Sequence, residues 1–202
     1  MGINYGQVAD KLPPPSSTTK LLQSTSIQKV RLYGSDPAII KALANTGIGI
    51  VTGTANGDIP GLASDPNFAK SWINTNVLPF FPASNIILIT VGNKVMNSND
   101  QNLMNKLLPA RQNVPNALND ASLGGKIKVS TVHSMGLLKQ SEPPSSRSID
   151  QSYGDLMKGL PNAGRMDGNT KIKYMNMFDA QVDAVYSALN SMGFKNVEMT
   201  TT

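Results

Sequence analysis

The 202-residue sequence contains no cysteine and a single histidine, His133. Without cysteine there are no disulfides, thiolate metal ligands or cysteine nucleophiles, and one histidine excludes any site that needs two. A Ser-His-Asp triad would have to use His133, which has no nucleophile-elbow pattern beside it. The sequence also lacks a Walker loop and a dinucleotide fingerprint. We therefore expect neither a metal nor a cofactor.

Charged and aromatic residues are also scarce, at 15% and 5% of the chain. The net charge is +5, but the basic residues are dispersed and no aromatic stripe lies between them, which argues against a nucleic-acid groove. The longest apolar runs, such as residues 86–89, are far shorter than the roughly 18 residues of a membrane helix. The first six residues do not resemble a secretion signal. A soluble globular protein is expected, with its native compartment left open.

Short β-branched runs alternate with longer stretches of helical period, which is typical of βα units and a parallel sheet. Strands are predicted near residues 3–5, 29–33, 49–52, 86–92 and 127–132, with a last strand from about 196. Asp36-Pro37 and Asp65-Pro66 each supply a helix N-cap followed by a proline at the first helical position. Gly47 is the expected end of the first of these two helices, and Trp72 in the second is expected in the core. Further helices are predicted over about 100–122, with prolines at 109 and 115 inside it, and over 175–192.

The number of predicted strands limits the fold. A closed eight-stranded barrel typically takes about 250 residues, whereas we count six strands in 202 residues. About forty residues between Val132 and Tyr174 contain one short helical stretch, 153–160, which indicates either a mobile flap or a lost βα unit. The arithmetic favours an incomplete barrel or an open α/β sheet.

Several motifs occur together in one order. They are Gly2-Ile-Asn-Tyr-Gly6, Leu12-Pro-Pro-Pro15, Val30-Arg-Leu-Tyr33, residues 38–47, Thr54-Ala-Asn-Gly-Asp58, Trp72-Ile-Asn-Thr-Asn-Val77, Val91-Gly-Asn93 and residues 178–186. With these motifs the chain resembles the family-17 glycoside hydrolases, the plant endo-β-1,3-glucanases, densely from residue 2 to about 160 and again from 161 to 197. The resemblance implies a (β/α)8 ancestor that hydrolyses β-1,3-glucan with retention of configuration.

The resemblance and the strand count together give the expected fold. It is an α/β, incomplete (β/α)8 TIM-barrel-like fold with about six parallel strands, in a single truncated domain over residues 1–202. Comparison with the family places a deletion seam at Leu160–Pro161, where relatives carry an aromatic-rich strand that lines the sugar cleft.

The catalytic carboxyl groups of the family are missing from these 202 residues. Retaining hydrolysis needs two carboxyl groups about 5–5.5 Å apart, one acting as acid and one as nucleophile. The family's acid is the Glu of Val-Gly-Asn-Glu, and the corresponding run here is Val91-Gly-Asn-Lys94. The family's nucleophile motif, Glu-[Ser/Thr]-Gly-Trp-Pro, does not occur, and neither Glu142 nor Glu198 matches it. We therefore predict no catalytic residue, with Lys94 at the acid position.

Three residues match family positions that point into the sugar-binding end of the barrel. They are Tyr5, Tyr33 and Asn93, and the resemblance implies that they bind substrate. Ordinary packing is the alternative for both tyrosines, and a loop hydrogen bond is the alternative for Asn93.

Three functions remain open from the sequence. The first is a catalytically inactive glucanase-like protein that retains weak β-1,3-glucan binding. The second is a truncated remnant that acts through protein contacts, or self-associates through exposed sheet edges. The third is residual hydrolase activity through Asp36 or Asp58, although a helix cap and a turn explain these residues better. Schiff-base chemistry at Lys94 has no supporting motif. The resemblance implies an extracellular or cell-wall location, and a cytoplasmic product stays open.

Overall fold

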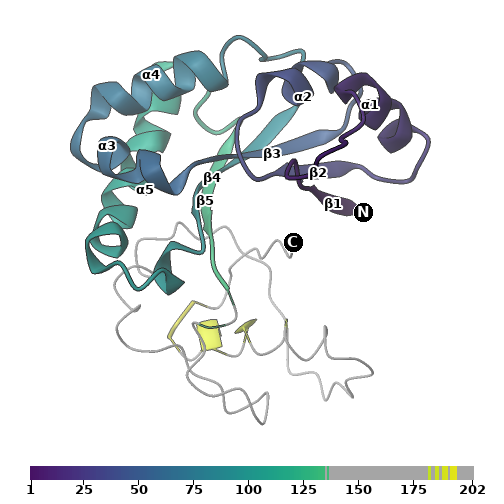
Figure 1. The fold of residues 1–202 in the computed structure, drawn as a ribbon. Coiled ribbons are helices and arrows are strands. Elements are labelled where there is room, and N and C mark those ends of the chain that lie inside the picture. Colours follow the sequence, from purple (N-terminus) through teal and green to yellow (C-terminus); the bar gives the residue numbers. More distant parts are fainter. Residues whose placement is uncertain (135, 137–181, 183–184, 187, 191, 195–202) are drawn as a thin grey trace. The chain divides into compact units, whose positions relative to one another are not determined.

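The computed structural model describes residues 1–134, 136, 182, 185–186, 188–190 and 192–194. These residues fall into two compact units, Met1–Val132 and the described part of His133–Thr201. Figure 1 shows the first unit with its strands and helices labelled. The candidate site lies entirely within this first unit.

The first unit is built around a sheet of five parallel strands in the order β1-β2-β3-β4-β5. The strands are β1 (Gly2–Tyr5), β2 (Lys29–Leu32), β3 (Gly49–Thr54), β4 (Ile86–Asn93) and β5 (Lys128–Val132). The five helices are α1 (Pro15–Gln23), α2 (Pro37–Ala42), α3 (Ile59–Ser64), α4 (Pro66–Asn76) and α5 (Gln101–Asp120), with short 3-10 turns η1 (Asn56–Asp58) and η2 (Val95–Asn97). Figure 1 shows the labelled helices on one side of the sheet.

Sequential parallel strands joined by helices are the repeating unit of a (β/α) barrel. Among the described residues the sheet does not close into a ring, because no strand there pairs with the outer edge of β1. The predicted incomplete barrel is thus confirmed for five strands. The predicted sixth strand near residue 196 lies outside the described residues, as do the 153–160 stretch and the seam at 160–161.

The core forms between the sheet and its helices. β3 is buried along its whole length, and β2 is buried at all but its first residue. Fully buried aliphatic side chains come from both layers: Leu32, Ile50 and Ile89 from the strands, and Ile39, Ile40, Leu62, Ile73, Leu107 and Leu118 from the helices. Trp72 is 8% exposed, so its predicted place in the core is confirmed.

The predicted helix starts are confirmed by hydrogen bonds. An Oδ1 of Asp36, Asp65 and Asp100 accepts the N–H of the second or third residue of α2, α4 and α5, at 2.7, 2.8 and 3.0 Å. These bonds satisfy N–H groups that have no partner within the helix. Residues 182, 185–186 and 188–190 of the predicted last helix are helical as well, whereas Met192 already lies in a turn, and Gly193 follows at φ 86°.

Other local predictions differ from the structure. α2 ends at Ala42, before the expected Gly47, because the chain leaves the helix at Leu43 to reach β3. α5 continues through Pro109 and Pro115, since its buried face, which includes Leu107 and Leu118, packs on the rest of the unit. The helices α1 and α3 were not predicted. None of the helices in the described part of the chain is long and apolar enough to cross a bilayer.

Candidate functional site

The chemistry-bearing residues gather where the parallel strands end. Tyr5 ends β1, Tyr33 follows β2, Asn56 lies just beyond β3, and Asn93 ends β4. Carboxyl ends of parallel strands meet at one edge, which is where barrel proteins place their sites. We call this set of strand ends, together with Lys94, the carboxyl edge.

The backbone turns at Gly92, the residue before Asn93. Side chains of a regular strand alternate between faces, so Asn93 would share a face with Val91 if β4 remained regular. Gly92 has φ 69°, which breaks this alternation. A Cβ added at Gly92 would lie 2.7 Å from side-chain carbons of both Ile59 and Val95. Glycine is therefore required here both for its conformation and for the close packing.

Three neighbouring groups fix the end of β4. The Asn56 side chain accepts the Asn93 N–H at 2.7 Å and donates its Nδ2–H to the Asn93 carbonyl at 3.1 Å. The Gly92 N–H donates to Thr54 Oγ1 at 3.1 Å. On the other side, the Lys94 N–H donates to the Val132 carbonyl at 3.0 Å. The backbone around Asn93 is thus held from both β3 and β5.

Arg31 connects Tyr33 with Asn93. It is 6% exposed, its Nη2–H donates to Asn93 Oδ1 at 3.1 Å, and its guanidinium carbon lies 4.6 Å from the Tyr33 ring centroid. This distance is within the range of a cation–π contact. Burial lowers the pKa of Arg31, an effect that Tyr33 partly opposes, but the guanidinium stays protonated at physiological pH. The Tyr33 side of this arrangement is open, because Tyr33 is 51% exposed.

Lys94 lies directly beyond Asn93 with an exposed side chain. Its φ of 53° and ψ of 31° put it in the left-handed region, which is uncommon for residues other than glycine and asparagine. The hydrogen bonds of Asn93 and of the Lys94 N–H hold the chain in this conformation. The ammonium group therefore projects from a fixed point of the carboxyl edge.

Tyr5 is placed differently from Tyr33 and Asn93. Its hydroxyl shares a 3.3 Å hydrogen bond with Thr18 Oγ1 of α1. In the β1–β2 register Tyr5 pairs with Leu32, whereas Asn4 pairs with Arg31. Because paired residues share a face of the sheet, Tyr5 lies on the Leu32 face and Asn4 on the face of Arg31. The structure thus links Tyr33 and Asn93 through Arg31 and turns Tyr5 towards α1.

The two aspartates considered as alternative carboxylates both make structural hydrogen bonds. Asp36 caps α2 through one oxygen, and its other oxygen accepts Gln7 Nε2–H at 2.6 Å. Asp58 accepts the Ala55 N–H at 3.1 Å. Within the part of the chain that the structure describes, no group of three or more His, Asp or Glu side chains is placed to hold a metal ion.

Sequence reasoning missed Arg31 and Asn56 as parts of this site. A signal for Arg31 was present in the sequence. It is a charged residue between Val30 and Leu32 in a buried strand, and Tyr33, two residues further on, is expected on the same face. Asn56 had no comparable signal, since its partner Asn93 is 37 residues away.

Solved structures of a β-1,3-glucanase and of a plant β-glucan endohydrolase resemble this chain closely. One is CJP38, a β-1,3-glucanase and pollen allergen of Cryptomeria japonica, with a TM-score of 0.91 and 30% identity, covering 100% of this chain and 74% of that one. A plant β-glucan endohydrolase matches with a TM-score of 0.82 and 28% identity, over 96% of this chain and 72% of that one. The expected relation to the TIM-barrel fold is confirmed.

Sequence comparison agrees with this likeness. Glucan endo-1,3-beta-glucosidase 7 of Arabidopsis thaliana is 60% identical over 98% of this chain and 47% of its own length. A glucan endo-1,3-beta-D-glucosidase of Olea europaea is 53% identical over 98% of this chain and 51% of its own. The chain thus spans about half the length of these relatives. The sequence profile of the glycosyl hydrolases family 17 matches residues 1–165, and the chain belongs to this family.

Proposed function

We propose that this chain binds β-1,3-glucan at the carboxyl edge and does not hydrolyse it. The glucan as ligand is supported by the relatives, which are glucan endo-1,3-beta-glucosidases. An exposed aromatic ring beside a fixed amide is a suitable surface for a sugar, because the ring stacks on the apolar sugar face and the amide hydrogen-bonds its hydroxyls. Tyr33 and Asn93 supply these two groups.

The proposed absence of hydrolysis rests mainly on the lysine at position 94. The resemblance implies that its position holds the general acid in active members, and an ammonium group is a poor proton donor to a leaving oxygen near neutral pH. Both oxygens of Asp36 and the Oδ2 of Asp58 accept structural hydrogen bonds, which argues against either aspartate as a substitute acid. The residues of this chain contain no match to the family's nucleophile motif.

An internal deletion is also part of this proposal. The alignment with the Arabidopsis relative runs over 235 positions, more than the 202 residues of this chain, so the relative contains residues without a counterpart here. The family profile ends at residue 165, close to the proposed seam at 160–161. We keep a single glucanase-like domain over residues 1–202 and an extracellular or cell-wall location as predictions.

The test measures hydrolysis and binding separately. Purified protein is incubated with laminarin, released reducing ends are counted, and binding of a laminari-oligosaccharide is followed by calorimetry. We expect binding without turnover, loss of binding in Tyr33→Ala, and retention in Tyr33→Phe, which keeps the ring. Lys94→Glu alone should remain inactive. Turnover by the unmodified chain or by this single variant would show that a competent nucleophile is present and would overturn the proposal.

The edge of β1 supports a second candidate function, self-association. Ile3 and Tyr5 are half-exposed, and Gly2 and Asn4 are exposed, unlike the buried residues of β3. An unpaired strand edge presents N–H and C=O groups that a second chain can pair with. Sedimentation that shows a concentration-dependent dimer, abolished by Ile3→Lys, would favour this function. A compact monomer at all concentrations would exclude it.

A further inference from the structure

We infer that the carboxyl edge prefers a glucan that carries an anionic substituent over the neutral polymer. The inference rests on the proposed function and deepens it by naming the ligand class. In the proposed arrangement a sugar ring stacks on Tyr33, and the anionic group of a neighbouring sugar faces the Lys94 ammonium.

The spacing of the strands suits such a ligand. Tyr33 follows β2 and Lys94 follows β4, with β3 between them. Two strand spacings amount to about 10 Å, so one short oligosaccharide spans both residues. The Arg31–Asn93 hydrogen bond crosses the same interval and joins the two strand ends.

Two side chains along this interval, those of Arg31 and Lys94, carry positive charge. Arg31 is buried under Tyr33, and Lys94 projects outward from a backbone fixed by Asn56 and Val132. The aspartates Asp36 and Asp58 at the same edge each accept backbone N–H bonds, which partly offset their charge. A neutral sugar gains little from the ammonium of Lys94, whereas a carboxylate or sulfate gains a charge-assisted contact. Because Lys94 is exposed, salt should weaken this gain.

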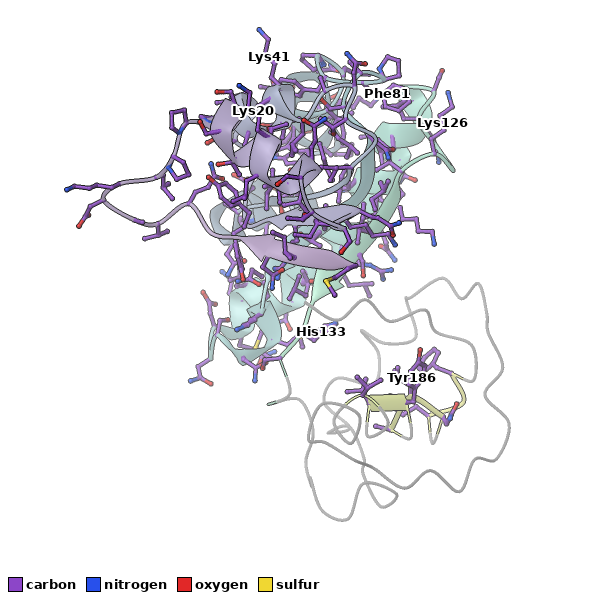
Figure 2. The ribbon with its side chains drawn as sticks, turned by 90° about the vertical axis from the view of Figure 1, so that its right-hand side faces the viewer. Lys20, Lys41, Phe81, Lys126, His133 and Tyr186 are labelled. Carbon is purple, nitrogen blue, oxygen red and sulfur yellow. The ribbon has the colours of Figure 1, made fainter. Side chains whose placement is uncertain are left out.

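The test compares three oligosaccharides of equal length: a neutral laminari-oligosaccharide, one with a primary alcohol oxidised to a carboxylate, and one with a sulfate ester there. Calorimetric affinities are measured for the unmodified protein, Lys94→Gln, Lys94→Glu and Lys41→Gln. Lys41 is an exposed lysine of α2 that points away from the body of the unit, so it controls for net charge (Figure 2).

We expect the anionic oligosaccharides to bind about five-fold more tightly than the neutral one at low salt, with the preference reduced at high salt. Lys94→Gln should abolish the preference, Lys94→Glu should reverse it, and Lys41→Gln should keep it. A stronger effect of carboxylate or of sulfate identifies which anionic group the site accepts, and either result supports the inference.

Three results would overturn the inference. Equal affinity for neutral and anionic ligands, with binding still lost in Tyr33→Ala, would refute the charge preference but leave the proposed glucan binding intact. A preference that survives in Lys94→Gln, or disappears in Lys41→Gln, would assign it to the overall charge instead of Lys94. If the protein binds none of the three oligosaccharides, the proposed function is refuted as well.

Discussion

Replacing Gly92 with alanine tests the packing that places Asn93 and Lys94. At φ 69° an alanine incurs about 1–2 kcal/mol of backbone strain. Its Cβ would also lie 2.7 Å from Ile59 Cδ1 and from Val95 Cγ2, both in fully buried side chains. Forcing an extra carbon into a packed core costs a further 1–3 kcal/mol, roughly. We therefore expect Gly92→Ala to lower the free energy of unfolding by about 2–5 kcal/mol.

Two other glycines separate the two contributions. Gly47 has φ 75° but nothing within 4 Å of an added Cβ, so Gly47→Ala should show the backbone cost alone, about 1–2 kcal/mol. Gly34 has no neighbour within 4 Å and no positive φ, so Gly34→Ala should change stability by less than about 1 kcal/mol. Urea unfolding of the three variants gives these values directly. If Gly92→Ala costs no more than Gly47→Ala, the close packing of the β4 end on Ile59 and Val95 is refuted.

Three further substitutions test the surrounding scaffold by the same urea measurement. Asp65→Ala removes the acceptor of the Asn67 N–H and should cost about 1 kcal/mol, so an unchanged midpoint would contradict the capping bond. Leu107→Ala empties a fully buried position of α5 and should cost about 2–5 kcal/mol, whereas a cost below about 1 kcal/mol would contradict that burial. Lys70→Gln breaks a 2.8 Å ion pair with Asp120 whose side chains are 50% and 56% exposed, so we expect less than about 0.5 kcal/mol, and a larger loss would contradict the exposure.

The strands and most helix starts could be predicted because their causes are local. β-branched runs specify strands through side-chain packing on a pleated surface, and an aspartate before a proline caps its own helix. Asp36 and Asp65 do this in the structure as predicted. The short helix α3, in contrast, has six residues and one glycine, too few for a periodic signal.

The links between site residues could not be predicted because they join distant parts of the chain. Arg31 and Asn93 are 62 residues apart, and Asn56 and Asn93 are 37 apart. Such contacts depend on strand register, and a shift of one residue moves every side chain to the other face. The Tyr5 orientation shows this, because the β1–β2 register places it opposite Leu32 and on the face away from Arg31. Family resemblance alone grouped Tyr5 with Tyr33, whereas the register separates them.

The interactions that fix residue 94 explain why a lysine there is compatible with the family fold. The backbone is held by the Asn56 amide, Thr54 Oγ1 and the Val132 carbonyl, and none of these contacts involves the side chain of residue 94. That side chain is exposed, so neither its charge nor its length disturbs the core. We therefore predict that exchanging glutamate and lysine at this position alters the chemistry of the carboxyl edge at little cost in stability. A fold similar to that of the glucanases consequently does not show whether residue 94 donates a proton. The activity and binding assays of the Lys94 variants address that question.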